Sequence, residues 1–148
     1  MRRTLLWLLD NSVIQRLRLP AVYDSVQELA QRGSIASCLP QTLAEGYSAR
    51  NPEDHRLVLN GNLLGKVMLA PMPGMVQIAI DIQRRLFAAG LGRGAGAFDI
   101  EIAATAIAHS SDGTEVTVVH YDNDFDQIGR VCPEFQHQWV APRASLPY

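Results

Sequence analysis

Residues 5–12 read LLWLLDNS, five apolar residues followed directly by three polar ones. A short apolar run of this kind is typical of a strand that is buried on both faces of a sheet. Residues 115–122, EVTVVHYD, are laid out in the same way, with a β-branched run before an acidic segment. We therefore expect two buried strands, each of which ends close to an aspartate, Asp10 or Asp122.

Helical patterns occupy most of the chain between these two strands. Pro20 begins one of them, and Gly33 ends it. The other expected helices cover residues 11–19 (a helix start), 40–49, 52–65, 75–89 and 98–109, and the other extended segments cover residues 34–39, 66–72 and 136–140. Strands that alternate with helices predict an α/β fold, here one α/β/α sandwich with a mainly parallel central sheet flanked by helices. Residues 1–141 are expected to form this domain, and residues 142–148 an unstructured tail.

The composition is that of one globular domain with no excess of basic charge. The chain has 148 residues, of which 47% are hydrophobic and 19% charged. Its net charge of −2, from 13 basic and 15 acidic residues, argues by itself against nucleic-acid binding. If four acids bind cations, however, 13 basic residues face only 11 acidic ones, and the objection weakens.

The cysteines and the N-terminal segment favour a cytoplasmic protein. Cys38 and Cys132 lie in apolar contexts, and no CxxC or HExxH motif is present, which disfavours a zinc site. We expect two buried free thiols in a reducing compartment. The N-terminal apolar run is cut short at Asp10, which argues against a signal peptide, and no apolar stretch is long enough to span a membrane.

Acidic residues stand where a site on a parallel sheet would form. Ligands of open α/β sheets bind beyond the carboxyl ends of the strands, where Asp10 and Asp122 are expected. Asp99 opens an otherwise apolar helix, where it would also complement the helix dipole. Each of these positions alone is explained by a turn or a cap. Glu45 alone is best explained as a solvated acid on a helix face.

The order of these segments resembles that of PIN-domain nucleases, and of VapC-type toxins in particular. It comprises DNS after the first strand, an acid in the helix after the second, FDIEIAATAIA at residues 98–108, and VVHYDNDFDQI at residues 118–128. The resemblance covers the chain from Leu6 to about Val140, and HYDNDFDQI is its most specific part. It implies that the catalytic metal ligands are Asp10, Glu45, Asp99 and Asp122, with Asp124 as an auxiliary ligand.

The resemblance also implies an activity and partners. An all-carboxylate ligand set suits Mg²⁺ or Mn²⁺, and such ions activate water for attack on a phosphodiester. The chain is thus expected to be a metal-dependent endoribonuclease, the toxin of a toxin–antitoxin pair, with RNA as substrate, a cognate antitoxin as partner, and a homodimeric state. The alternatives are a PIN-domain RNA-processing nuclease without an antitoxin, and a catalytically silent PIN-fold module that binds RNA or protein.

A few further residues are candidates for contact with RNA. Arg16 follows Asp10 closely, and it would either contact phosphate or lie on a solvated helix face. Tyr121 and Phe125 have rings that can stack on bases, although Phe125 fits better as a core residue. One departure from the family pattern is the GRGAGA loop before Asp99, where Arg93 is the sole basic residue.

Overall fold

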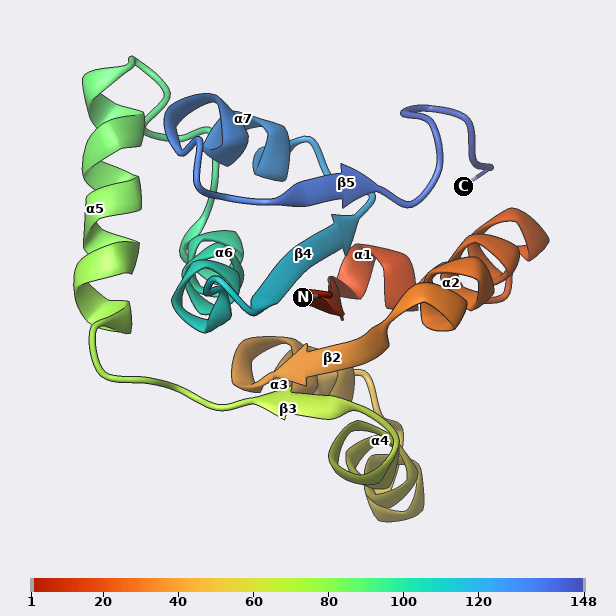
Figure 1. The fold of residues 1–148 in the computed structure, drawn as a ribbon. Coiled ribbons are helices and arrows are strands. Elements are labelled where there is room, and N and C mark those ends of the chain that lie inside the picture. The colour runs from red at the N-terminus through yellow and green to blue at the C-terminus, as the bar shows by residue number, and fades with distance from the viewer. Residues whose placement is uncertain (1, 148) are drawn as a thin grey trace.

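The computed structural model describes residues 2–147, and at its centre is a five-stranded sheet in the order β3-β2-β1-β4-β5 (Figure 1). The strands are β1 Thr4–Leu9, β2 Ser34–Cys38, β3 Val67–Leu69, β4 Thr114–His120 and β5 His137–Trp139. All four neighbouring pairs are parallel. The carboxyl ends of the strands therefore meet at one edge, which confirms the expected α/β class.

Helices cover both faces of this sheet, with α2 on one face and α5 and α6 on the other (Figure 1). The helices are α1 Asn11–Ile14, α2 Pro20–Arg32, α3 Leu39–Tyr47, α4 Pro52–Leu64, α5 Met75–Ala88, α6 Ala97–His109 and α7 Asp124–Val131. Among residues 2–147, no helix is both long and apolar enough to cross a membrane.

The apolar run of β1 is explained by its position in the middle of the sheet. Leu6 and Leu8 point into the core shared with α5 and α6. Trp7 and Leu9 point into the second core, which α2 covers. Because successive side chains of a strand alternate between its faces, a strand covered on both sides must be apolar throughout. β1 is therefore fixed in register by both cores.

Two segments differ from what the sequence suggests. The acidic stretch after β4 forms α7, a helix that the analysis of the sequence missed. Its buried residues Phe125 and Ile128 lie three positions apart, which is the spacing of one helix face. Residues 142–147 contain no helix or strand, but they contact the rest of the domain. The backbone N–H of Leu146 donates to the hydroxyl oxygen of Tyr121 at 3.0 Å, and Leu146 packs against the second core.

Candidate active site

Asp10 stands at the carboxyl end of β1 and is 4% exposed. Its Oδ2 accepts a hydrogen bond from the backbone N–H of Ser12 at 3.0 Å, and this caps α1. The hydroxyl of Ser12 in turn accepts one from the backbone N–H of Tyr121 at 2.9 Å. Ser12 therefore ties the end of β1 to the end of β4. Burial raises the pKa of the Asp10 carboxyl, against the lowering effect of its hydrogen bonds with Ser12.

Three further aspartates come together at the same edge of the sheet. Asp99 lies in the first turn of α6, Asp122 follows β4, and Asp124 begins α7. Each offers a carboxylate oxygen, and these oxygens lie within 4.8 Å of one another. The backbone N–H of Asp124 donates to Oδ1 of Asp122 at 2.9 Å, which orients that carboxylate. We call these three residues the aspartate cluster.

The carboxyl groups of the aspartate cluster are buried close together, so deprotonation of all of them is unfavourable without a cation. The pKa of Asp99 is raised to about 8, first by burial, then by a hydrogen bond with Asp124, and then by the charges of Asp10, Asp122 and Asp124. The donor set consists of hard oxygen atoms, which divalent cations such as Mg²⁺ and Mn²⁺ prefer. The residues present therefore fit a divalent cation, which would neutralise their mutual repulsion.

The carboxylate of Glu45 is hydrogen-bonded to residues outside the aspartate cluster. Its Oε1 accepts hydrogen bonds from Nε2 of Gln41 at 2.9 Å and from Nδ2 of Asn62 at 3.1 Å. Nζ of Lys66 lies 3.8 Å from the same oxygen. Within the described residues, the carboxylate oxygens that converge within 4.8 Å do not include that of Glu45. Asp10 is also outside this group of oxygens, but its charge acts on the pKa of Asp99, whereas Glu45 is paired with Gln41, Asn62 and Lys66.

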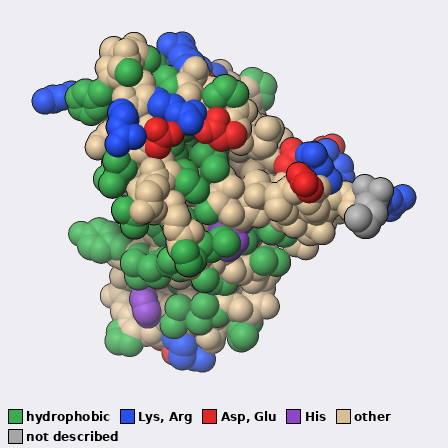
Figure 2. Space-filling model, turned by 60° about the vertical axis from the view of Figure 1, so that its left-hand side comes forward, with side chains coloured by type: hydrophobic (Ala, Val, Ile, Leu, Met, Phe, Trp, Pro, Cys, Tyr) green, Lys and Arg blue, Asp and Glu red, His purple; other side chains and the backbone are tan. Residues whose placement is uncertain are grey.

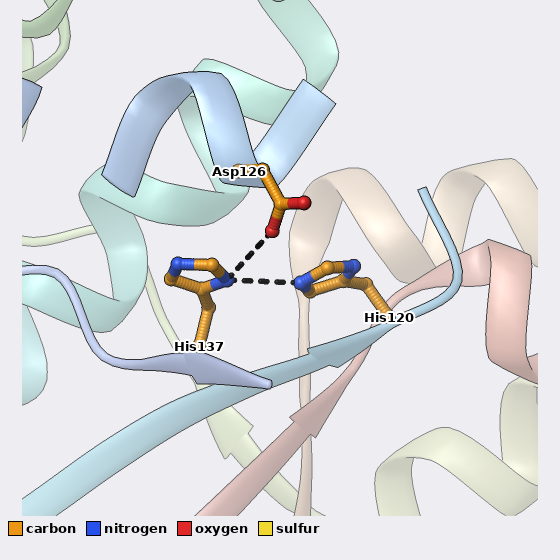
Figure 3. A group of neighbouring side chains, drawn as sticks. All are labelled: His120, Asp126 and His137. Carbon is orange, nitrogen blue, oxygen red and sulfur yellow. Dashed lines mark hydrogen bonds and ion pairs between the residues drawn. The ribbon is translucent and has the colours of Figure 1, made fainter. Parts of the chain in front are cut away.

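A second group of ionisable side chains, which the sequence did not suggest, is connected to the backbone of Asp122. His120, Asp126 and His137 converge from β4, α7 and β5 (Figure 3). Nδ1 of His120 accepts from the backbone N–H of Asp122 at 3.2 Å, so the ring proton is on Nε2, which faces Nδ1 of His137 at 3.0 Å. His120 therefore links the backbone of Asp122 to β5.

This histidine pair is uncharged at neutral pH. The pKa of His120 is lowered to about 4, first by burial and then by the neighbouring His137, while Asp126 acts in the opposite direction. Burial also lowers the pKa of His137. With one proton shared between facing nitrogens, the pair acts as a structural connection and not as a ligand pair. The widely spaced histidines gave no motif from which to find it.

The raised pKa of Asp99 predicts how the stability of the metal-free protein depends on pH. Between pH 3.8 and about 8, folded Asp99 keeps a proton that the unfolded chain has lost, so stability falls as the pH rises. Below pH 6.5 the lowered pKa of His120 acts in the opposite sense. We therefore expect the melting temperature in EDTA to fall between pH 6.5 and 8. Asp99→Asn is the control, and an equal fall in that variant would contradict the assignment.

Two curated proteins are similar in sequence to this chain over nearly its whole length. It is 36% identical over 140 residues to "Ribonuclease VapC51" of Mycobacterium tuberculosis (strain ATCC 25618 / H37Rv), covering 95% of this chain and 96% of that protein. It is 35% identical over 137 residues to "Ribonuclease VapC21" of Mycobacterium tuberculosis (strain CDC 1551 / Oshkosh), covering 92% and 95%. No family model matches the chain.

The fold has also been seen before. The structure of VapBC2 from Rickettsia felis, bound to a DNA fragment from their promoter, contains a chain that matches with a TM-score of 0.70 and 17% sequence identity. The match covers 90% of this chain and 98% of that one. At this identity the match concerns the fold alone, and it confirms the expected sandwich over nearly the whole chain.

Proposed function

This chain belongs to the family of VapC ribonucleases, and from that membership we propose that it is a metal-dependent endoribonuclease and the toxin of a toxin–antitoxin pair. The single observation that carries the proposal is the aspartate cluster at the carboxyl edge of the sheet. The two relatives are named ribonucleases, and their similarity covers nearly the whole chain.

In this proposal the aspartates are the catalytic residues and hold Mg²⁺ or Mn²⁺. Asp99, Asp122 and Asp124 offer converging oxygens, and Asp10 adds negative charge from the adjoining strand end. A divalent cation at such a site neutralises charge on a phosphodiester and lowers the pKa of water there. The protein's own part is to orient: Ser12 fixes the Asp10 carboxylate, and the N–H of Asp124 fixes that of Asp122.

Glu45 has a different place in the proposal. Its carboxylate is engaged by Asn62 and lies near Lys66, so it contributes as a ligand only if those contacts are exchanged. We propose that Glu45 is a metal ligand of this conditional kind, which reaches the cation once its contacts with Asn62 and Lys66 are exchanged. Glu45→Gln is then expected to weaken cleavage less than replacement of Asp99 does.

The proposed protein partners are an antitoxin and a second copy of the chain. Hydrophobic side chains gather on the face that α5 presents (Figure 2), and Val76, Ile80 and Phe87 of α5 are each more than half exposed. Large exposed apolar surface of this kind marks protein–protein contact. The VapBC composition of the matched structure supports an antitoxin as one occupant.

We propose the cytoplasm as the place of action. Cys38 and Cys132 are both buried free thiols, as expected from the sequence, and free thiols are usual in a reducing compartment.

A divalent cation is expected to stabilise the folded protein. Binding to the aspartate cluster favours the native state because the unfolded chain has no such site. At a hundred times its dissociation constant, the cation should raise the melting temperature by about 5 °C or more. Thermal unfolding in Mn²⁺, in Mg²⁺ and in EDTA measures this shift. Equal melting temperatures in all three would contradict a cation site.

The test of the function is cleavage of total cellular RNA by the purified protein, in Mn²⁺, in Mg²⁺ and in EDTA. Discrete fragments that require the cation are expected, and added antitoxin, encoded beside the toxin, should suppress them. Cleavage with no neighbouring antitoxin gene would favour the RNA-processing nuclease. Binding of RNA without any cleavage, by folded protein free of inhibitor, would favour the catalytically silent module.

A further inference from the structure

A cavity lined by arginine and aromatic side chains opens where β4 and β5 end, at the carboxyl edge of the sheet. Its volume is about 220 Å³, and its walls include Arg16, Tyr121, Trp139 and Arg143. Tyr121 immediately precedes Asp122, and Trp139 is the last residue of β5. Arg16 follows α1, and its Nη1 donates to the backbone oxygen of Ser12 at 2.8 Å. We call this space the arginine–aromatic cavity.

Each arginine of this cavity lies over an aromatic ring. Cζ of Arg16 lies 4.9 Å from the centroid of the Tyr121 ring, and Cζ of Arg143 lies 6.0 Å from that of Trp139. Within residues 2–147, neither guanidinium group has a carboxylate partner within 4.0 Å. Two positive charges without acidic partners thus stand over two aromatic faces, in a chain whose net charge is −2.

The walls of the cavity are fixed before any ligand enters. Nε1 of Trp139 donates to both carboxylate oxygens of Asp126, at 3.0 and 3.2 Å. The ring of Tyr121 meets that of Trp139 edge-on, at 83° and 5.4 Å between centroids. Ala144 and Leu146 complete the lining of the cavity. The φ of Ala144 is 61°, which is rare for a residue with a side chain. The backbone N–H of Leu146 donates to the Tyr121 hydroxyl oxygen. A site held in this way loses little entropy on binding.

We propose that the arginine–aromatic cavity binds one nucleotide of a single-stranded part of the RNA substrate, and this inference rests on the proposed ribonuclease function. A nucleotide combines an anionic phosphate with a flat base, which matches guanidinium groups that lie over aromatic rings, because a base stacks on a guanidinium plane as well as on a ring. Ser12 contacts both Asp10 and Arg16, and Tyr121 is the residue before Asp122, so the cavity adjoins the strand ends that carry two of the acids. An acidic protein segment would use the charges but has no need of a site next to the acids.

The first test measures RNA affinity with cleavage switched off. In an Asp99→Asn background, binding of a fluorescein-labelled single-stranded RNA of mixed sequence is followed by anisotropy at several salt concentrations. Arg143→Glu is expected to weaken binding about tenfold and to lower the slope of log affinity against log salt by about 0.7. The matched control is Arg32→Glu, because Arg32 lies over Trp7 at 5.3 Å, just before β2 begins, towards the opposite edge of the sheet.

The second test reports stacking without altering the cavity. The chain has two tryptophans, so Trp139 is the only one left in a Trp7→Phe variant. Trp7 is buried, and its Nε1 has no hydrogen-bond partner among the described residues, so phenylalanine should be tolerated there. The RNA should quench Trp139 emission with the same midpoint as the anisotropy change.

The outcomes separate this inference from the function on which it rests. If the wild-type protein cleaves RNA while Arg143→Glu binds it as tightly as Arg32→Glu does, or Trp139 emission stays constant, the cavity is not an RNA site. If Arg143→Glu weakens only the binding of antitoxin, the cavity is a protein-docking site and the inference is wrong. If the wild-type protein neither cleaves nor binds RNA, the ribonuclease assignment fails as well.

Discussion

Replacing Asp99 with asparagine is expected to lower the rate of RNA cleavage by at least about a hundredfold. The loss of a residue that merely orients a metal ligand commonly costs ten- to a hundredfold in metal affinity or activity, and a direct ligand costs no less. Asp99 shares its surroundings with Asp122, Asp124 and Asp10, and its own pKa is raised to about 8 by that burial and charge. Asparagine keeps the shape of the side chain but cannot form the carboxylate that binds a cation. Initial rates on total RNA in Mn²⁺ measure the effect.

The control for this variant lies on the same helix. Glu101 is exposed and stands two residues beyond Asp99 on α6, so its side chain points to a different side of the helix. Glu101→Gln makes the same exchange of a carboxyl group for an amide and should cleave RNA within about twofold of the wild-type rate. Similar rates for Asp99→Asn and the wild-type protein would remove Asp99 from the catalytic residues. EDTA-resistant cleavage in all samples would reveal a contaminating nuclease instead.

Phe125→Ala is expected to destabilise the protein by about 3–5 kcal/mol, a large part of the stability of a domain of this size. Phe125 is completely buried in α7, and its ring lies 4.9 Å from that of His120 and 6.2 Å from that of Phe135. Alanine there would leave a cavity under the helix that begins at Asp124. Urea unfolding gives the free energy directly.

A second phenylalanine supplies the comparison for this variant. Phe98 is 42% exposed, and Phe98→Ala should cost less than about 1 kcal/mol. Equal losses in the two variants would show that α7 packs less tightly than described. The burial of Phe125 also decides between its two readings in the sequence, because a fully buried ring is a core residue and has no face free for a base.

The parts of the fold that the sequence predicts are those with strong local patterns. Residues 98–109 are apolar almost all round, which indicates a buried helix, and α6 covers that range with one more residue at its start. The helix α7 was missed because it is short and has only two buried apolar residues, Phe125 and Ile128, among acidic ones. The extended segments expected at residues 66–72 and 136–140 contain β3 and β5, but these strands are only three residues long, and their bounds are set by pairing with their neighbours. Pairing of this kind depends on distant parts of the chain and leaves little mark on the local sequence.

The same limit applies to the candidate site. The position of Asp10 and Asp122 at one edge of the sheet could be predicted because each follows a recognisable strand, and parallel strands place their ends together. The pairing of Glu45 with Asn62 spans 17 residues and joins two helices, so no local pattern announces it. The link between His120 and His137 depends on β5 lying beside β4. Contacts that need the assembled sheet were therefore beyond the sequence, whereas the order of acids along the chain was not.

The strands of the sheet differ in how firmly they are paired, so local opening should begin at one side of the sheet. Strands β1 and β4 are joined over six residue pairs, from Thr4↔Thr114 to Leu9↔Val119, whereas β3 is joined to β2 over three. Local opening events start where few contacts hold a segment, so amide hydrogens near β3 and α4 should exchange with solvent sooner than those of the central strands. Such an opening would release the Glu45 carboxylate from Asn62 while Asp10 stays in register with the strand that leads to Asp122.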